Sequence, residues 1–380
     1  MSATTIKTEE RRITPVVYAI LAVIAALGLA LAIYRLVKGL GPTTNLSNGY
    51  PWGLWIAFDF FAVPFSAGAF TLALVSVIFN RDEYHGVAHL ALLAGFLGYL
   101  MVVLVLLLDI GRWDQFWSVL LPWRWNLHSF MFEVSLSITL YFGVMILELL
   151  PIVFQDRDWL PVQVAGRLIA LLAALGILLS TVHQGSIGAI FLILRHKLHE
   201  LWWTPILPLL FLTSALFSGL SVAIFLAILT WRALERPVPM KLLSDLAKLA
   251  AIIQAVYLVL KLGDLLLAGE LGRIFDSGGY SLLWLVEVII GVVVPLVIFG
   301  SRARERENML LVGSFCVFVG LAINRATQAW FALEPPSGAT YAPHWIEWAI
   351  VVAAFSGGIL FYSLGVRYLK GLRKPVQEGH

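Results

Sequence analysis

Charged residues are scarce in this chain. Of its 380 residues, 13% are charged and 60% are hydrophobic, and the mean hydropathy is +0.89. Ordinary soluble domains carry about 25% charged residues. The composition therefore excludes a soluble fold and is typical of a protein that crosses the membrane many times. A net charge of +3 also argues against a nucleic-acid-binding surface.

Cysteine is almost absent, and histidine is infrequent. Cys316 is the single cysteine, which excludes a disulfide framework and a four-cysteine iron–sulfur cluster within the chain. Any electrons must therefore come from another subunit. His89, His128 and His183 lie in or beside apolar stretches, but they form no repeated pattern of the kind that bis-histidine haem ligation needs. We expect neither haem nor another metal site.

Long apolar runs fill most of the sequence. At about 20 residues per crossing, they predict an all-α integral membrane protein with ten helices, forming a single membrane domain over 1–380. The first run, 15–33, is too long for a signal peptide and has no convincing cleavage site, so we interpret it as a spanning helix. The expected helices are 15–38, 51–79, 87–111, 127–150, 163–184, 204–232, 243–268, 279–299, 308–331 and 344–369.

The basic residues predict the orientation of these helices. The N-terminus, the even-numbered loops and the C-terminus hold 17 of the 26 Lys and Arg, against 7 in the odd-numbered loops. Loops rich in Lys and Arg stay in the cytoplasm. We therefore expect a bacterial inner-membrane protein with both termini cytoplasmic. Tryptophan follows the opposite pattern, because 12 of 14 fall on the outer side, which favours protein contact or a cavity there.

The spacing of acidic residues suggests a weak internal repeat. Asp109 and Glu133 are 24 residues apart, and Asp264 and Glu287 are 23 apart, each pair on consecutive helices. This spacing predicts two parallel four-helix bundles. The first bundle is helices 2–5 (51–184) and the second is helices 6–9 (204–331), with helices 1 and 10 (15–38 and 344–369) beside them.

Ionisable residues inside the apolar runs gather toward the outer ends of the helices. A charge at mid-membrane costs about 2.5–3.5 kcal/mol, so such residues usually have a function. Together they suggest a site that handles protons and opens to one surface. They are Asp59, Asp109, Glu133, Lys261, Asp264, Glu287, Arg325 and Glu347.

Two short motifs are candidates for redox chemistry. Asp109 and Arg112 are three residues apart and can pair on one helix face, either as a helix-end ion pair or as a proton-exchanging site for a quinone. His183 precedes two glycines that would allow a broken backbone at the end of its helix. A histidine there can hydrogen-bond a quinone carbonyl, although a purely structural histidine is the alternative. We expect His183 and Asp109 at the same depth.

The fourth expected helix carries a polar stripe. Glu133, Ser137, Tyr141 and Glu148 recur at near-helical spacing, which suits either a proton path or hydrogen bonds between helices. Asp59 is a further candidate for that path. In the second bundle, neutralisation among buried charges is the favoured interpretation. Those charges are Lys261, Asp264, Glu287, Arg325 and Glu347.

Six segments together resemble the NrfD/polysulfide-reductase family, and most closely its ten-helix branch, the HybB-type membrane subunits of nickel–iron hydrogenases. The resemblance covers about residues 45–350. The segments are 48–59 (NGYPWGLWIAFD), 79–85 (FNRDEYH), 109–112 (DIGR), 126–133 (NLHSFMFE), 183–188 (HQGSIG) and 197–202 (KLHELW).

The resemblance implies a haem-free, quinone-reactive membrane subunit. Its electrons would come from an extracytoplasmic iron–sulfur protein that hydrogenase large and small subunits reduce, and they would pass to menaquinone or ubiquinone. Asp109 and His183 fall at the quinone-site positions, with Glu133 and Arg112 beside them. His128 and Gln184 complete the candidate set. Other complexes with molybdenum or multihaem partners use the same family, and a secondary transporter is a rival from another class.

Overall fold

The computed structural model describes residues 15–68, 71–72, 85–154, 162–335 and 337–369. In these ranges the chain is helical, and its only β structure is two isolated bridges, Ser47 with Tyr50 and Leu198 with Leu333. The all-α prediction is therefore confirmed. Residues 79–84 of the family-like segment lie outside the described residues.

The described helices follow the apolar runs closely. The long ones are α1 (Pro15–Lys38), α4 (His85–Asp109), α5 (Phe130–Val153), α6 (Val162–Ile190), α7 (Leu207–Ala233), α8 (Met240–Leu267), α12 (Glu307–Ala326) and α13 (Trp345–Tyr368). The shorter ones are α2 (Leu54–Ala62), the 3-10 turns η2 (Trp113–Leu120), η3 (Pro122–Arg124), η4 (Phe191–Leu194) and η6 (Arg302–Glu305), and α9 (Arg273–Asp276). A further crossing is continuous through α10 (Gly279–Val288), the π-helix η5 (Ile289–Val293) and α11 (Val294–Gly300), and a second π-helix, η7 (Thr327–Phe331), extends α12.

Nine helices in the described part of the chain are long and apolar enough to cross a membrane. The expected helix 51–79 is described mainly over Leu54–Gly68. Burial separates the helices by role: only 6% of the most apolar window of α1 is buried, against 72% for α7. We infer that α1 faces lipid and that α7 lies at the centre.

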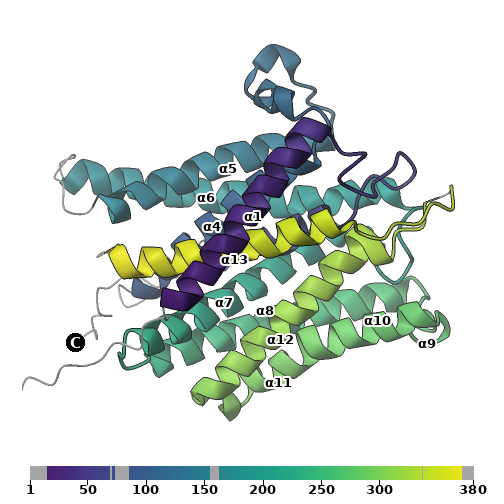
Figure 1. Ribbon diagram of the computed structural model, residues 1–380. Coiled ribbons are helices and arrows are strands. Elements are labelled where there is room, and N and C mark those ends of the chain that lie inside the picture. Colours follow the sequence, from purple (N-terminus) through teal and green to yellow (C-terminus); the bar gives the residue numbers. More distant parts are fainter. Residues whose placement is uncertain (1–14, 69–70, 73–84, 155–161, 336, 370–380) are drawn as a thin grey trace, which may run out of the picture.

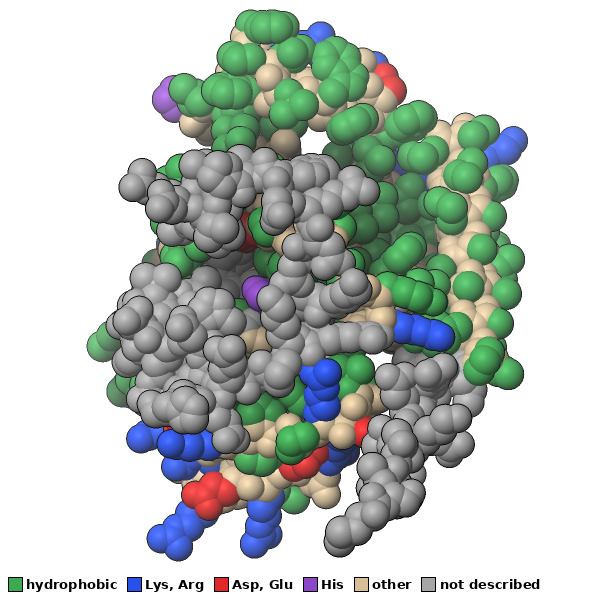
Figure 2. Space-filling model, turned by 90° about the vertical axis from the view of Figure 1, so that its left-hand side faces the viewer, with side chains coloured by type: hydrophobic (Ala, Val, Ile, Leu, Met, Phe, Trp, Pro, Cys, Tyr) green, Lys and Arg blue, Asp and Glu red, His purple; other side chains and the backbone are tan. Residues whose placement is uncertain are grey.

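The helices have two distinct ends. Asp109 is the last residue of α4, and α2, α5, α7 and α13 begin at that end; we call it the Asp109 end. Arg367 lies in the last turn of α13, and we call the opposite side the Arg367 end. Figure 2 views the molecule from the Arg367 end, where basic side chains gather along the lower edge.

Helix packing brings two groups together. The first group is α2, α4, α5 and α6, and the second is α7, α8, α10–α11 and α12; α7 contacts α4 and α6 as well as its own group. α1 crosses α13 on the outside (Figure 1). Glycines allow the two groups to approach closely, since a Cβ on Gly68 would lie 2.3 Å from the carbonyl oxygen of Gly219.

The expected backbone break after His183 is wrong. α6 continues without interruption to Ile190. The glycine at position 188 serves packing instead, because a Cβ there would lie 2.6 Å from the Cα of Pro208 at the start of α7. Close approach of α6 and α7 therefore explains this glycine, and His183 lies well inside a regular helix.

Candidate functional site

His183 is the centre of a buried polar cluster in the first group. Its side chain is fully buried, and Nδ1 lies 2.9 Å from Oγ of Ser137 on α5. Its ring lies 5.8 Å from that of Tyr99 on α4, which packs edge-to-face on Tyr141 at 4.5 Å. Three helices therefore hold this imidazole; we call the four residues the His183 cluster.

The hydrogen bond to Ser137 leaves both histidine tautomers accessible. Oγ of Ser137 also lies 2.9 Å from the carbonyl oxygen of Val134, and a hydroxyl has only one proton to donate. When Ser137 donates to Val134, Nδ1 of His183 donates to Ser137 and Nε2 is an acceptor. When Ser137 donates to Nδ1, Nε2 carries the proton. The cluster can thus present either a donor or an acceptor at Nε2.

Several buried polar atoms around the cluster have no hydrogen-bond partner within the described residues. They include Nε2 of His183, the hydroxyl of Tyr99 and the amide nitrogen of Gln184. Buried polar groups are normally hydrogen-bonded, so such exceptions need an explanation. One explanation is a polar ligand that forms a hydrogen bond with Nε2 of His183.

A second bridge between α5 and α6 leads from the cluster to the surface. Ser186 donates to Glu133 at 2.6 Å, one helical turn beyond the contact between Ser137 and His183. Glu133 is exposed at the Asp109 end, and Tyr141 is fully buried. The predicted stripe thus runs from an exposed carboxylate to the buried cluster, and Glu148 continues it half-buried on α5.

Asp109 belongs to a different group of charges. Asp59 on α2, Glu347 on α13 and Arg35 on α1 are the charged groups that interact with it or with each other there. Arg35 is fully buried and donates to the carbonyl oxygen of Ile110 at 2.9 Å. Both oxygens of Asp59 and one of Asp109 lack hydrogen-bond partners within the described residues.

Asp109 and His183 do not share a depth, so that prediction is wrong. The ring of His183 lies against Tyr99, ten residues before Asp109 on the same helix. At 1.5 Å per residue this is about 15 Å along the axis. Asp109 and His183 are therefore too far apart to contact the same quinone ring.

The predicted pairing of Asp109 with Arg112 is also wrong. α4 ends at Asp109, and Arg112 turns outward to Asp114, with its Nη2 3.1 Å from the carboxylate. Hydrogen bonds from Arg112, which is exposed, lower the pKa of Asp114. His128 is likewise exposed in the loop before α5. Neither Arg112 nor His128 lies in the His183 cluster.

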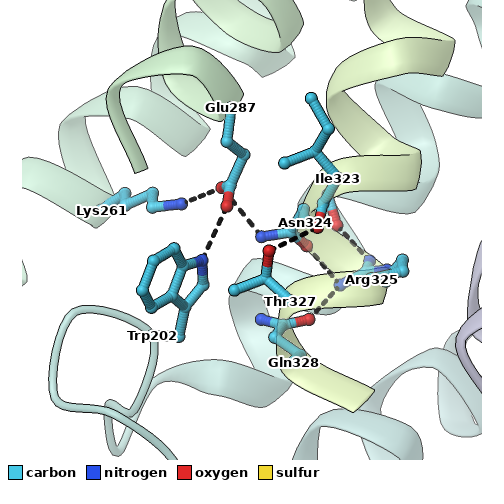
Figure 3. A network of polar contacts seen from close by, with 9 residues as sticks. Trp202, Lys261, Glu287, Ile323, Asn324, Arg325, Thr327 and Gln328 are labelled. Carbon is cyan, nitrogen blue, oxygen red and sulfur yellow. Dashed lines mark hydrogen bonds and ion pairs between the residues drawn. The ribbon is translucent and has the colours of Figure 1, made fainter. Parts of the chain in front are cut away.

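The second group contains a buried network of charged and polar side chains (Figure 3). Glu287 accepts hydrogen bonds from Trp202 at 2.7 Å and Asn324 at 2.9 Å, and it pairs with Lys261. Arg325 donates to Asn324, Gln328 and Ser214 and lies 3.7 Å from the ring centre of Phe211. We call this set the Glu287 network. Glu287 pairs with Lys261, whereas the hydrogen-bond partners of Arg325 are neutral side chains, so charge neutralisation among all of the predicted residues stays a prediction.

Two residues of the predicted second cluster, Asp264 and Glu347, lie outside the Glu287 network. Asp264 lines a small cavity of about 20 Å³ beside Lys261 and Arg325. Glu347 is not part of the network: it caps α13 by accepting from the backbone nitrogens of His344 and Asn45 and from the hydroxyl of Tyr341. Burial, and then that hydrogen bond, raise the pKa of Tyr341.

Two residues of the site were not predicted from sequence. Tyr99 is a lone tyrosine in an apolar run, without any spacing that distinguishes it from core. Arg35 was not among the predicted site residues, yet it is fully buried and its charge acts on Asp109. Its place in the last turn of α1 was the available signal.

Comparison with known proteins places this architecture in a family. Residues 42–329 match the family model "Polysulphide reductase, NrfD". The chain is 32% identical over 358 residues to the "Probable Ni/Fe-hydrogenase 2 b-type cytochrome subunit" of Escherichia coli (strain K12), covering 93% of this chain and 91% of that protein. The resemblance predicted from the motifs is thus confirmed.

Two further relatives belong to other complexes. The chain is 32% identical over 374 residues to the "Menaquinone reductase, integral membrane subunit" of Nitratidesulfovibrio vulgaris, covering 90% of this chain and 88% of that protein. It is 22% identical over 419 residues to a selenate reductase subunit of Mesobacillus selenatarsenatis, covering 96% of each.

Proposed function

This chain belongs to the polysulphide reductase NrfD family, and we propose that it is the quinone-reactive membrane subunit of a nickel–iron hydrogenase complex. In this proposal an extracytoplasmic iron–sulfur subunit, reduced by hydrogenase large and small subunits, delivers electrons at the Asp109 end. Membrane quinone, either menaquinone or ubiquinone, receives them. The chain lies in the bacterial inner membrane with both termini cytoplasmic, and it is not catalytic alone.

The observation that best supports a quinone site is the unpartnered Nε2 atom of His183. Its Nε2 has no partner within the described residues, while Ser137 and Tyr99 fix the ring. A quinone takes up two electrons and two protons when it is reduced. His183 would donate a hydrogen bond to a quinone carbonyl in one tautomer and accept one from a quinol hydroxyl in the other.

Protons would reach His183 along the contacts between α5 and α6. Glu133 is exposed and hydrogen-bonded to Ser186, and Ser137 contacts His183 one turn deeper. Asp109 lies about 15 Å from the level of Tyr99, so its role is proton exchange or quinone entry at the Asp109 end rather than contact with the same ring. Ser137, Tyr141, Glu148 and Asp59 complete the proposed path.

We propose that the chain carries no haem. A bis-histidine site needs two imidazoles that face each other across helices. In the described part of the chain, the ring of His183 contacts Ser137 and Tyr99, and His128 is exposed. His89 lies ten residues before Tyr99 on α4, about 15 Å along the helix axis, so it does not face His183. These histidines do not fit a b-type haem, although the relative from Escherichia coli has "b-type cytochrome" in its name. An optical spectrum of the purified chain without haem bands is the expected result.

The quinone assignment is tested in the intact complex. His183→Ala and Asp109→Asn are expected to abolish hydrogen-dependent quinone reduction while the soluble subunits still reduce an artificial dye. Arg112→Gln, outside the cluster, is the matched control and is expected to keep normal turnover. Normal quinone turnover in both site variants would overturn the assignment.

A second candidate function keeps the quinone site and changes the partner. A relative is named as a selenate reductase subunit, so similar chains occur outside hydrogenases; the alternative that we propose is a molybdenum or multihaem partner module. Purification of the tagged chain in mild detergent, with mass spectrometry of the proteins that accompany it, separates the two. Hydrogenase large and small subunits support the proposal, and any other redox module replaces it.

Proton translocation is a further part of the proposal. It rests on the polar stripe of α5, which runs from Glu133 to Glu148. Proteoliposomes that turn over quinone are expected to show a pH change larger than quinone chemistry alone produces. A change equal to that of the chemistry alone would contradict it.

A further inference from the structure

A cavity of about 480 Å³ lies on the opposite side of α4 from the His183 cluster. It is a slot between α7 and α13, with side chains of α2 and α4 as its floor and Tyr18 of α1 at one end. Its lining includes Met101 of α4 but neither Tyr99 nor His183. It is therefore distinct from the proposed quinone site.

The slot exists because two helices share a neighbour without packing on each other. α7 and α13 both contact α4 but make few contacts together. The hydroxyls of Thr230 and Tyr362 are hydrogen-bonded across the slot at 3.0 Å. Small residues widen the space, and at Gly358 an added Cβ would meet nothing within 4 Å.

The lining changes from polar to apolar along the slot. Away from the ends of α7 and α13 its lining is apolar and includes Phe58, Phe65 and Met101. The polar lining residues gather where α1 begins and where α7 and α13 end. They are Tyr18, Thr230, Tyr362, Ser363 and Arg367.

We propose that the slot binds one acyl chain of a phospholipid from the leaflet at the Arg367 end, with the phosphate beside Arg367. The apolar interior suits hydrocarbon, the hydroxyls suit the ester region, and arginine suits phosphate. A quinone in it would lie apart from His183.

Filling the slot is the direct test. Gly358→Leu places a side chain in it, and Gly143→Leu on α5 is the matched control, because Gly143 also has nothing within 4 Å of an added Cβ and does not line the slot. Native mass spectrometry of the full chain in mild detergent is expected to show one retained phospholipid in the wild type and in Gly143→Leu. Gly358→Leu is expected to lose it. Equal retention in all three would overturn the proposal.

The chemistry of the ligand is tested by titration of delipidated chain with phosphatidylglycerol, phosphatidylcholine or menaquinone. Arg367→Gln is expected to bind phosphatidylglycerol about fivefold more weakly, as expected for one basic residue at a membrane surface, and Arg367→Lys to restore most of that loss. Menaquinone that binds here and displaces phospholipid would overturn the proposal, as would phospholipid binding that Gly358→Leu leaves unchanged. Neither result bears on turnover at His183.

Discussion

Asp59 in the first group and Glu287 in the second are both buried carboxylates, and their surroundings differ sharply. Glu287 has hydrogen bonds from Trp202 and Asn324 and an ion pair with Lys261. Neither oxygen of Asp59 has a hydrogen-bond partner within the described residues. A buried polar group without partners costs about 1–3 kcal/mol. The comparison suggests that the second group uses its charges to hold helices together, whereas the first keeps polar atoms available for protons and a ligand.

The contrast is one of degree. In the Glu287 network, Nε of Arg325 also lacks a partner within the described residues, but its other two nitrogens donate three hydrogen bonds. π-Helices begin just after both Glu287 and Arg325, at Ile289 and Thr327. π-Helices are frequent at functional sites. Measurements of stability and turnover on variants are therefore needed to show whether the second group is only structural.

The largest effect is expected from Glu287→Ala. Removal of this carboxylate leaves Lys261 buried without its partner, which costs about 3–5 kcal/mol. The temperature of unfolding in detergent is expected to fall sharply. The double variant Lys261→Met/Glu287→Leu, which removes both charges, is expected to recover most of it. If Glu287→Ala unfolds at the same temperature as the wild type, Glu287 has no structural role.

His183→Ala is expected to act on turnover and not on stability. Loss of a positioned acid–base group lowers a rate by about 10²–10⁴-fold, and the residue has no charged partner within the described residues whose loss would unfold the chain. Quinone reduction and the unfolding temperature are measured on the same preparation. If quinone reduction and the unfolding temperature fall together, His183 has a structural role like that of Glu287.

Ser137→Ala is expected to have a moderate effect. It removes one hydrogen bond that positions the imidazole, worth about 0.5–1.5 kcal/mol, so kcat falls by about two- to tenfold while KM changes little. Ser137→Thr keeps the hydroxyl and serves as the control. A larger effect of Thr than of Ala would count against a role through the hydrogen bond.

Arg112→Gln is expected to have the smallest effect. The pair with Asp114 is exposed and screened. Because Arg112 lowers the pKa of Asp114, the pair stabilises the fold above the ordinary pKa of about 3.9 and ceases to do so as pH falls through the lowered value. This stabilisation is present at pH 7, but it is small because both side chains are exposed to solvent, so the unfolding temperatures of the wild type and Arg112→Gln are expected to agree there. Loss of quinone turnover in Arg112→Gln would show that Arg112 acts together with Asp109.

Sequence predicted the helices well because apolar runs of membrane length have few alternatives. Helical spacing also predicted that Glu133 and Ser137 share one polar stripe, and the family resemblance placed Glu133 beside His183. Prediction from sequence failed where tertiary packing decides: α6 extends to Ile190 because a glycine at 188 lets it approach α7. Glu347 was assigned wrongly although a local signal existed, a capping box that begins at His344.

The arrangement around Asp109 could not be predicted for a similar reason. Arg35 and Asp109 are far apart in sequence, and the approach of α1 to the end of α4 is what brings them together. Tyr99 reaches His183 only through the packing of α4 on its neighbours. Pairwise spacing on one helix carries no information about such contacts, which is why the sequence predicted Arg112 as the partner of Asp109.

The central claim is that the quinone ring binds at His183 in the first group. Photolabelling of the intact complex with an azido-quinone, followed by mapping of the labelled peptides, tests it most directly. The expected labels fall on peptides that contain Tyr99, Ser137 or His183, and excess native quinone suppresses them. Labelling confined to the second group, or to the slot between α7 and α13, would contradict the account.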